Sequence, residues 1–110
     1  MAQDFERVAA SAVGTGETTL LTSNSDDALI GIRVTNILTA AVTCDCYIDK
    51  TGSGTDYHIC KSLTIPPSSS VELIQGGAKV VMQNTDVLHI KSNTGSALDV
   101  WVSYVDSIST

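Results

Sequence analysis

Apolar and polar residues alternate one by one through the middle of this chain, and that period restricts the backbone to extended strands. Successive side chains of a strand point to opposite faces, so an alternating segment places one face in a core and the other in water. A helix needs a period of about 3.6 residues instead. The clearest alternation is at 41–49, where Val42, Cys44, Cys46 and Ile48 alternate with Thr43, Asp45, Tyr47 and Asp49.

A second segment, 28–37, repeats this pattern and predicts another half-buried strand. Arg33 and Thr35 are expected on its outward face. Its inward face is expected to carry Ala28, Ile30, Ile32 and Val34.

Clusters of Gly, Pro, Asn, Asp and Ser interrupt the apolar segments about every ten residues, a spacing typical of sandwiches and barrels. Between these turns, strands are predicted at 17–22, 28–37, 41–49, 56–65, 70–75, 79–83, 86–92 and 98–106. A chain of 110 residues builds one hydrophobic core. We therefore expect an all-β fold, a two-sheet antiparallel β-sandwich of about eight strands, with either jelly-roll or immunoglobulin-like connections.

Residues 1–16 do not follow the strand rhythm, so the sandwich domain is expected at 17–110. Phe5, Val8, Ala9 and Ala12 have helical spacing, but the segment 13–16 contains two glycines that would end a helix early. One helical turn, a strand that caps a sheet edge and an extended arm all fit. We expect an N-terminal arm or capping segment.

The last predicted strand is apolar on both faces. Leu98, Val100, Val102 and Tyr104 share one face, while Trp101 and Val105 interrupt the otherwise polar opposite face. The outer face of a single sandwich is normally solvated. Trp101 is therefore expected under a loop or the N-terminal segment, with a subunit interface as the alternative.

Charge and cysteine content narrow the function classes. The net charge of −6, with six Lys and Arg in total, does not suit a phosphate-binding surface, so nucleic acid is not expected as a partner. The sequence has no apolar run long enough for a signal peptide or a membrane span, so we expect cytoplasmic synthesis and no membrane partner. Three cysteines do not form a disulfide framework, and we expect free thiols.

No pattern in the sequence predicts catalysis, a metal site or a cofactor, and we expect a protein that is not an enzyme. His58 and His89 are interpreted as solvent-side strand residues, and 24–27 as a turn rather than a cation site. The pair Cys44 and Cys46 is interpreted as core packing. Glycan binding would need an exposed aromatic platform, for which Tyr47, on the outer face of its strand, is the best placed.

Several runs of the sequence resemble small structural proteins of tailed bacteriophages. These runs are 28–36, 42–48, 65–73, 87–93 and 100–105, and the likeness extends over about residues 15–106. The resemblance implies a virion protein made in the host cytoplasm. Within that class we favour a capsid decoration or cement protein, which binds the outer capsid lattice. A neck, tail or fibre-associated component and a carbohydrate-binding module are the alternatives.

The resemblance also implies the kinds of partner and contact. The expected partners are the major capsid protein or another virion protein, together with further copies of this chain in a trimer or dimer. The expected contact residues lie in the N-terminal segment and on the apolar outer face, with Tyr47 as the glycan candidate. They are Phe5, Arg7, Val8, Tyr47, Trp101 and Val105.

Overall fold

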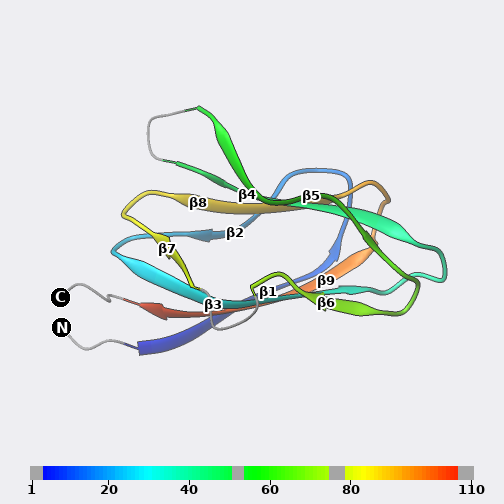
Figure 1. Ribbon diagram of the computed structural model, residues 1–110, viewed down its shortest axis with the longest axis horizontal. Coiled ribbons are helices and arrows are strands. Elements are labelled where there is room, and N and C mark those ends of the chain that lie inside the picture. The colour runs from blue at the N-terminus through cyan, green and yellow to red at the C-terminus, as the bar shows by residue number, and fades with distance from the viewer. Residues whose placement is uncertain (1–3, 51–53, 75–78, 107–110) are drawn as a thin grey trace.

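The computed structural model describes residues 4–50, 54–74 and 79–106, which form two stacked antiparallel sheets without a helix (Figure 1). The five-stranded sheet has the order β1-β9-β3-β6, with β7 also paired to β3, and the four-stranded sheet has the order β2-β8-β4-β5. The expected two-sheet sandwich is confirmed. Its strands are β1 Asp4–Val13, β2 Thr18–Thr22, β3 Asp27–Asn36, β4 Val42–Asp49, β5 Asp56–Ile65, β6 Ser70–Glu72, β7 Val80–Met82, β8 Val87–Ser92 and β9 Leu98–Asp106.

The strand pairing decides between the two connection patterns that the sequence left open. β4 pairs with β5, β3 with β6, β2 with β8 and β1 with β9, all antiparallel. The pairs are nested, as in one long hairpin whose two arms run side by side. Folding of this hairpin places successive strand pairs in alternate sheets. The connections are therefore of the jelly-roll type.

The segment before residue 17 is largely a strand, which is one of the three expected alternatives. β1 lies at one edge of the five-stranded sheet, where Phe5 is opposite Val105 and Ala9 is opposite Trp101. The register shifts between Ala10 and Val13. Residues 1–3 lie outside the described part of the chain.

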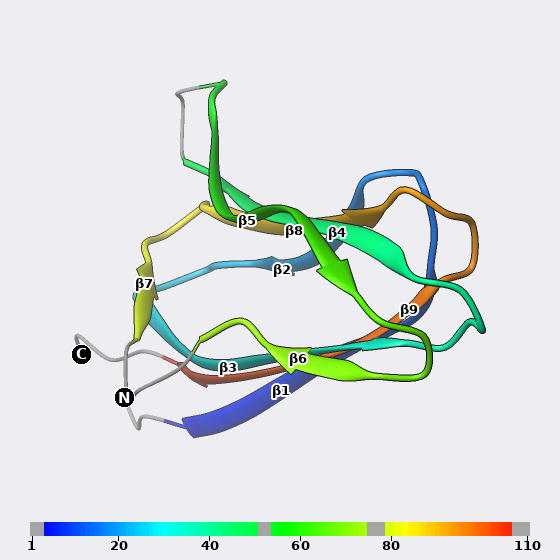
Figure 2. The ribbon, with the colours of Figure 1, turned by 45° about the vertical axis from the view of Figure 1, so that its right-hand side comes forward.

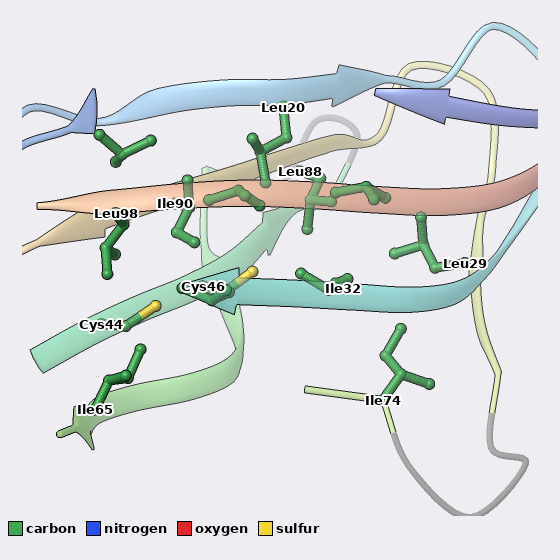
Figure 3. Close-up of a cluster of buried hydrophobic side chains, with 14 of the residues drawn as sticks. Leu20, Leu29, Ile32, Cys44, Cys46, Ile65, Ile74, Leu88, Ile90 and Leu98 are labelled. Carbon is green, nitrogen blue, oxygen red and sulfur yellow. The ribbon is translucent and has the colours of Figure 1, made fainter. Parts of the chain in front are cut away.

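The core fills the space between the inner faces of the two sheets (Figure 3). The four-stranded sheet supplies Cys44 and Cys46, both fully buried, and Figure 3 shows them pointing toward the five-stranded sheet. Both are free thiols, as expected. The fully buried apolar side chains include Leu29, Ile32, Val34, Ile65, Met82, Leu88, Ile90, Leu98 and Val102.

A register shift in β3 corrects the inward-facing set predicted for this strand. Between Leu29 and Gly31 the pairing with β9 slips by one residue. The slip lets Leu29 enter the core, fully buried, while Ile30 is only half-buried and lines a hollow on the outer face. The prediction that Ala28 and Ile30 face inward was wrong, because a bulge inverts the alternation that a regular strand would keep.

Asn36, at the end of β3, forms hydrogen bonds to both the β3–β4 connection and the end of β5 with the β5–β6 connection. Its side chain is fully buried. The amide nitrogen Nδ2 donates to the carbonyl oxygens of Ala40, Ile65 and Pro66 at 2.8, 3.0 and 3.2 Å, and Oδ1 accepts from the amide of Leu38 at 2.9 Å. One side chain thus satisfies backbone groups at the end of β5 and in the connections that follow β3 and β5.

Candidate interaction surface

The outer face of the five-stranded sheet carries a row of apolar side chains across its strands. Residues directly opposite one another in antiparallel strands project to the same face. Val81 of β7 is opposite Ala28 of β3, Ala28 is opposite Val105 of β9, and Val105 is opposite Phe5 of β1. Phe5 is 81% exposed and Val81 is 58% exposed, so both ends of this row face solvent, while Val105 is half-buried and Ala28 is buried between its neighbours.

Trp101 lies on the same face and is 51% exposed. Its neighbours in register are Ala9 on β1 and Arg33 on β3. The expectation that a loop or the N-terminal segment covers Trp101 was wrong. β1 joins the sheet beside β9 instead of lying across it, and the small side chain of Ala9 leaves the indole uncovered.

Arg7 is placed against the Trp101 ring. Its guanidinium carbon lies 5.3 Å from the ring centroid, within the range of a cation–π interaction. Both side chains project from neighbouring strands to the outer face, where Arg7 is opposite Ser103. The surface therefore presents a positive charge beside an aromatic ring in a protein whose net charge is −6.

Two shallow hollows flank Trp101. The first, of about 330 Å³, lies toward one end of the sheet, and the second, of about 590 Å³, lies toward Phe5. The first is lined by Ala9, Ala10, Ser11, Arg33, Thr35, Asp99, Val100 and Trp101. The second is lined by Phe5, Glu6, Arg7, Ile30, Trp101 and Ser103.

We call this surface the Trp101 face and define it as Phe5, Arg7, Ala9, Ile30, Val81, Trp101 and Val105. We take this face as the candidate interaction surface, because the solvated face of a sandwich normally alternates to polar residues, whereas this one exposes Trp101 and Phe5 on either side of Arg7 and Ser103. Arg7 also fits an interface, because arginine and aromatic residues are both enriched at protein interfaces.

Four of the residues predicted as contacts meet on the Trp101 face, and two do not. Phe5, Arg7, Trp101 and Val105 lie together, although they come from opposite ends of the sequence. Val8 is half-buried and packs against the core, because it alternates with Arg7 along β1. The sixth predicted residue, Tyr47, belongs to the other sheet.

Tyr47 is buried, with 3% of its surface exposed, so the prediction of an exposed aromatic platform was wrong. The rings of His58 and His89 flank it, at centroid distances of 5.1 and 5.5 Å. Its hydroxyl donates to Glu17 Oε1 at 2.5 Å. Burial raises the pKa of Tyr47 above its ordinary value, and this hydrogen bond to a carboxylate raises the pKa further.

The two histidines beside Tyr47 differ in exposure. His58 is exposed, as expected, but His89 is only 8% exposed, so its assignment to the solvent side was wrong. His89 Nδ1 lies 3.2 Å from Thr19 Oγ1 and 3.8 Å from Glu17 Oε2. Sequence reasoning missed Glu17, because it is thirty residues from Tyr47 and no local pattern connects them.

The turn at 24–27 is organised by internal hydrogen bonds. Ser23 Oγ donates to Asp27 Oδ2 at 2.9 Å, and Ser25 Oγ donates to Asp27 Oδ1 at 3.1 Å. Ser25 also bonds to Asp106 Oδ1 at 2.9 Å, which links the turn to the end of β9. Within the described ranges, no three His, Cys, Asp or Glu residues are grouped so that they could hold a metal ion.

No protein-family model matches the chain, and no curated protein matches it either. The part of the chain that the structure describes contains no helix long and apolar enough to cross a membrane.

Proposed function

We propose that this protein is a structural component of a tailed bacteriophage particle, and that it binds a virion protein through the Trp101 face. Within that role we favour a capsid decoration protein bound to the outer surface of the major capsid protein. The exposed Trp101, with Arg7 held 5.3 Å from its ring centroid, is the observation on which the proposal rests.

The composition of the face supports a protein partner. Trp, Phe and Arg are enriched at the centres of protein interfaces, and Trp and Arg are frequent binding hot spots. A flat sheet face with shallow hollows suits another protein surface better than a small molecule, which is normally enclosed in a deeper cleft.

The size of the face supports a role in a repeated assembly. One sheet face of a 110-residue sandwich offers a modest contact area. A lattice that presents the same site many times, or that lets linked copies bind together, converts modest single contacts into firm attachment.

Quantitative mass spectrometry of purified phage particles tests this proposal. A decoration protein is expected at a copy number comparable to that of the major capsid protein, or at a simple fraction of it. A copy number far below that of the major capsid protein would assign the protein to the neck, tail or fibres instead. Its absence from purified particles would overturn the virion proposal.

A further inference from the structure

The free edge of β1 differs from the other strand edges of the sandwich. From Asp4 to Ala10 its register with β9 is unbroken, and this stretch contains neither proline nor lysine, two residues that blunt exposed edges. Figure 2 shows β1 at the margin of the lower layer. Its outer backbone groups are therefore arranged to accept another strand.

The other strand edges carry features that interrupt pairing. The register of β5 with β4 shifts twice, and Ser62 of β5 has a positive φ of 52°. β2 has five residues with a shift in its pairing to β8, and β6 and β7 have three residues each. β1 also has a register shift after Ala10 and a positive φ of 53° at Ala12, but its stretch from Asp4 to Ala10 is the longest unbroken edge among the described strands.

We propose that β1 pairs antiparallel with β1 of a second copy of this chain, and that Phe5 of each copy fills the hollow beside Trp101 of the other. A two-fold axis perpendicular to the sheet relates the copies, so their five-stranded sheets join edge to edge and both Trp101 faces lie on the same side.

Charge excludes the registers of this pair that are centred on residues 4–7. Under the two-fold axis, centring the pair on Glu6 or Arg7 places two identical charges directly opposite each other, which is unfavourable in a sheet. Centring it on Val8 places Val8 opposite its own copy, Arg7 opposite Ala9, and Glu6 opposite Ala10. Registers centred on Ala9 or Ala10 also avoid direct like-charge pairs, but they place Phe5 opposite Val13 or Thr15, which do not line the hollow of about 330 Å³.

The same register brings Phe5 to the hollow of the second copy. With Val8 on the axis, continuing the register one residue past the unbroken stretch places Phe5 opposite Ser11, which together with Ala9 lines the hollow of about 330 Å³ on its β1 side. Phe5 is 81% exposed within one chain, and the Trp101 ring lines the same hollow. The exposed side chain of Phe5 thus meets the hollow beside Trp101 of the second copy, and the two-fold axis repeats this contact.

This inference deepens the proposed function by naming a partner for part of the same face, but dimerisation itself requires no phage particle. If the dimer forms and particles do not bind it, the virion proposal fails alone. If the protein is a monomer that still binds particles, the dimer proposal fails alone.

Sedimentation velocity of the full chain over 1 to 200 µM provides the first test. We expect a reversible dimer, at least about tenfold weakened by Phe5→Ser. Tyr57→Ser, which removes an aromatic residue of 52% exposure from the other sheet, is the matched control and should leave the dimer unchanged. A monomeric wild-type protein at 200 µM, or equal weakening by both substitutions, would overturn the proposal.

Disulfide trapping provides the second test and reports the register. In a Cys60→Ser background, Val8→Cys should give a covalent dimer with diamide as oxidant, because directly opposite residues of an antiparallel pair have Cβ atoms only about 4.5–5.5 Å apart. Ala9→Cys is the control, since the two copies of residue 9 are diagonal and their Cα atoms are about 7–8 Å apart. Faster trapping through residue 9 than through residue 8 would contradict the proposed register.

Discussion

The guanidinium carbon of Arg7 lies 5.3 Å from the centroid of the Trp101 ring, on the neighbouring strand of the same sheet. At such an exposed site a cation–π pair contributes about 0.5–1 kcal/mol. We expect a double-mutant cycle with Arg7→Met and Trp101→Leu, measured by urea unfolding, to give a coupling free energy of that size. A coupling of zero would show that Arg7 is not held by the ring.

Asn36 should be among the most sensitive positions for stability. Its side chain makes four hydrogen bonds to backbone groups while fully buried. Asn36→Leu leaves these groups without their partner, and the free energy of unfolding should fall by about 3 kcal/mol or more.

Asn36→Asp provides the comparison for this prediction. It keeps the shape of the side chain but places carboxylate oxygens against the three carbonyl oxygens that Nδ2 binds. Urea unfolding at pH 7 should show it to be at least as destabilised as the leucine variant. A loss below 1 kcal/mol for both variants would contradict the structural role of this side chain.

Tyr47 should make the fold sensitive to alkali. An unfolded tyrosine ionises near pH 10, whereas burial and the hydrogen bond to Glu17 raise the pKa of Tyr47 in the folded protein. Above about pH 10 the unfolded state releases a proton that the folded state retains. Stability is therefore lost as the pH rises, by up to about 1.4 kcal/mol per pH unit.

The variant Tyr47→Phe isolates this effect, because every other titrating group is the same in both proteins. Its free energy of unfolding should fall less steeply than that of the wild type between pH 10 and 12, and the two slopes should agree below pH 9. Parallel curves over the whole range would argue against a raised pKa at Tyr47.

The three thiols should differ in reactivity. Burial raises the pKa of Cys46, while the hydrogen bond between the Cys44 and Cys60 thiols, together with burial, raises that of Cys44. The same hydrogen bond lowers the pKa of Cys60, which is half-buried. Iodoacetamide at pH 8 should therefore alkylate Cys60 at least about tenfold faster than the other two, as measured by peptide mass spectrometry.

Much of the fold could be predicted because the period of alternation is a local property. The predicted strands 56–65 and 98–106 coincide with β5 and β9, and the others begin and end within one residue, except that β6 ends at Glu72. The structure of residues 1–16 was left open because Phe5, Val8, Ala9 and Ala12 have helical spacing, whereas the glycines within 13–16 would end a helix early. Pairing with β9, ninety residues away, decides for a strand.

The errors at the candidate site come from contacts that are distant in the sequence. Nothing near Tyr47 shows that Glu17 and His89 bury its ring, and nothing near Ile30 shows the register slip in β3. Trp101 was recognised as an unusual residue for an outer face, but whether it was covered depended on where β1 lay. The Trp101 face comes from four strands, so the pairings of β1 with β9, β9 with β3 and β3 with β7 are all needed to bring it together.

The central claim is that the Trp101 face is the surface that binds the particle. Its most direct test is co-sedimentation of purified protein with phage particles stripped of it. Trp101→Ser should reduce the bound fraction at least about tenfold, while Tyr57→Ser, a substitution of similar exposure on the other sheet, should bind as the wild type does. Equal binding by the wild type and Trp101→Ser would contradict the claim.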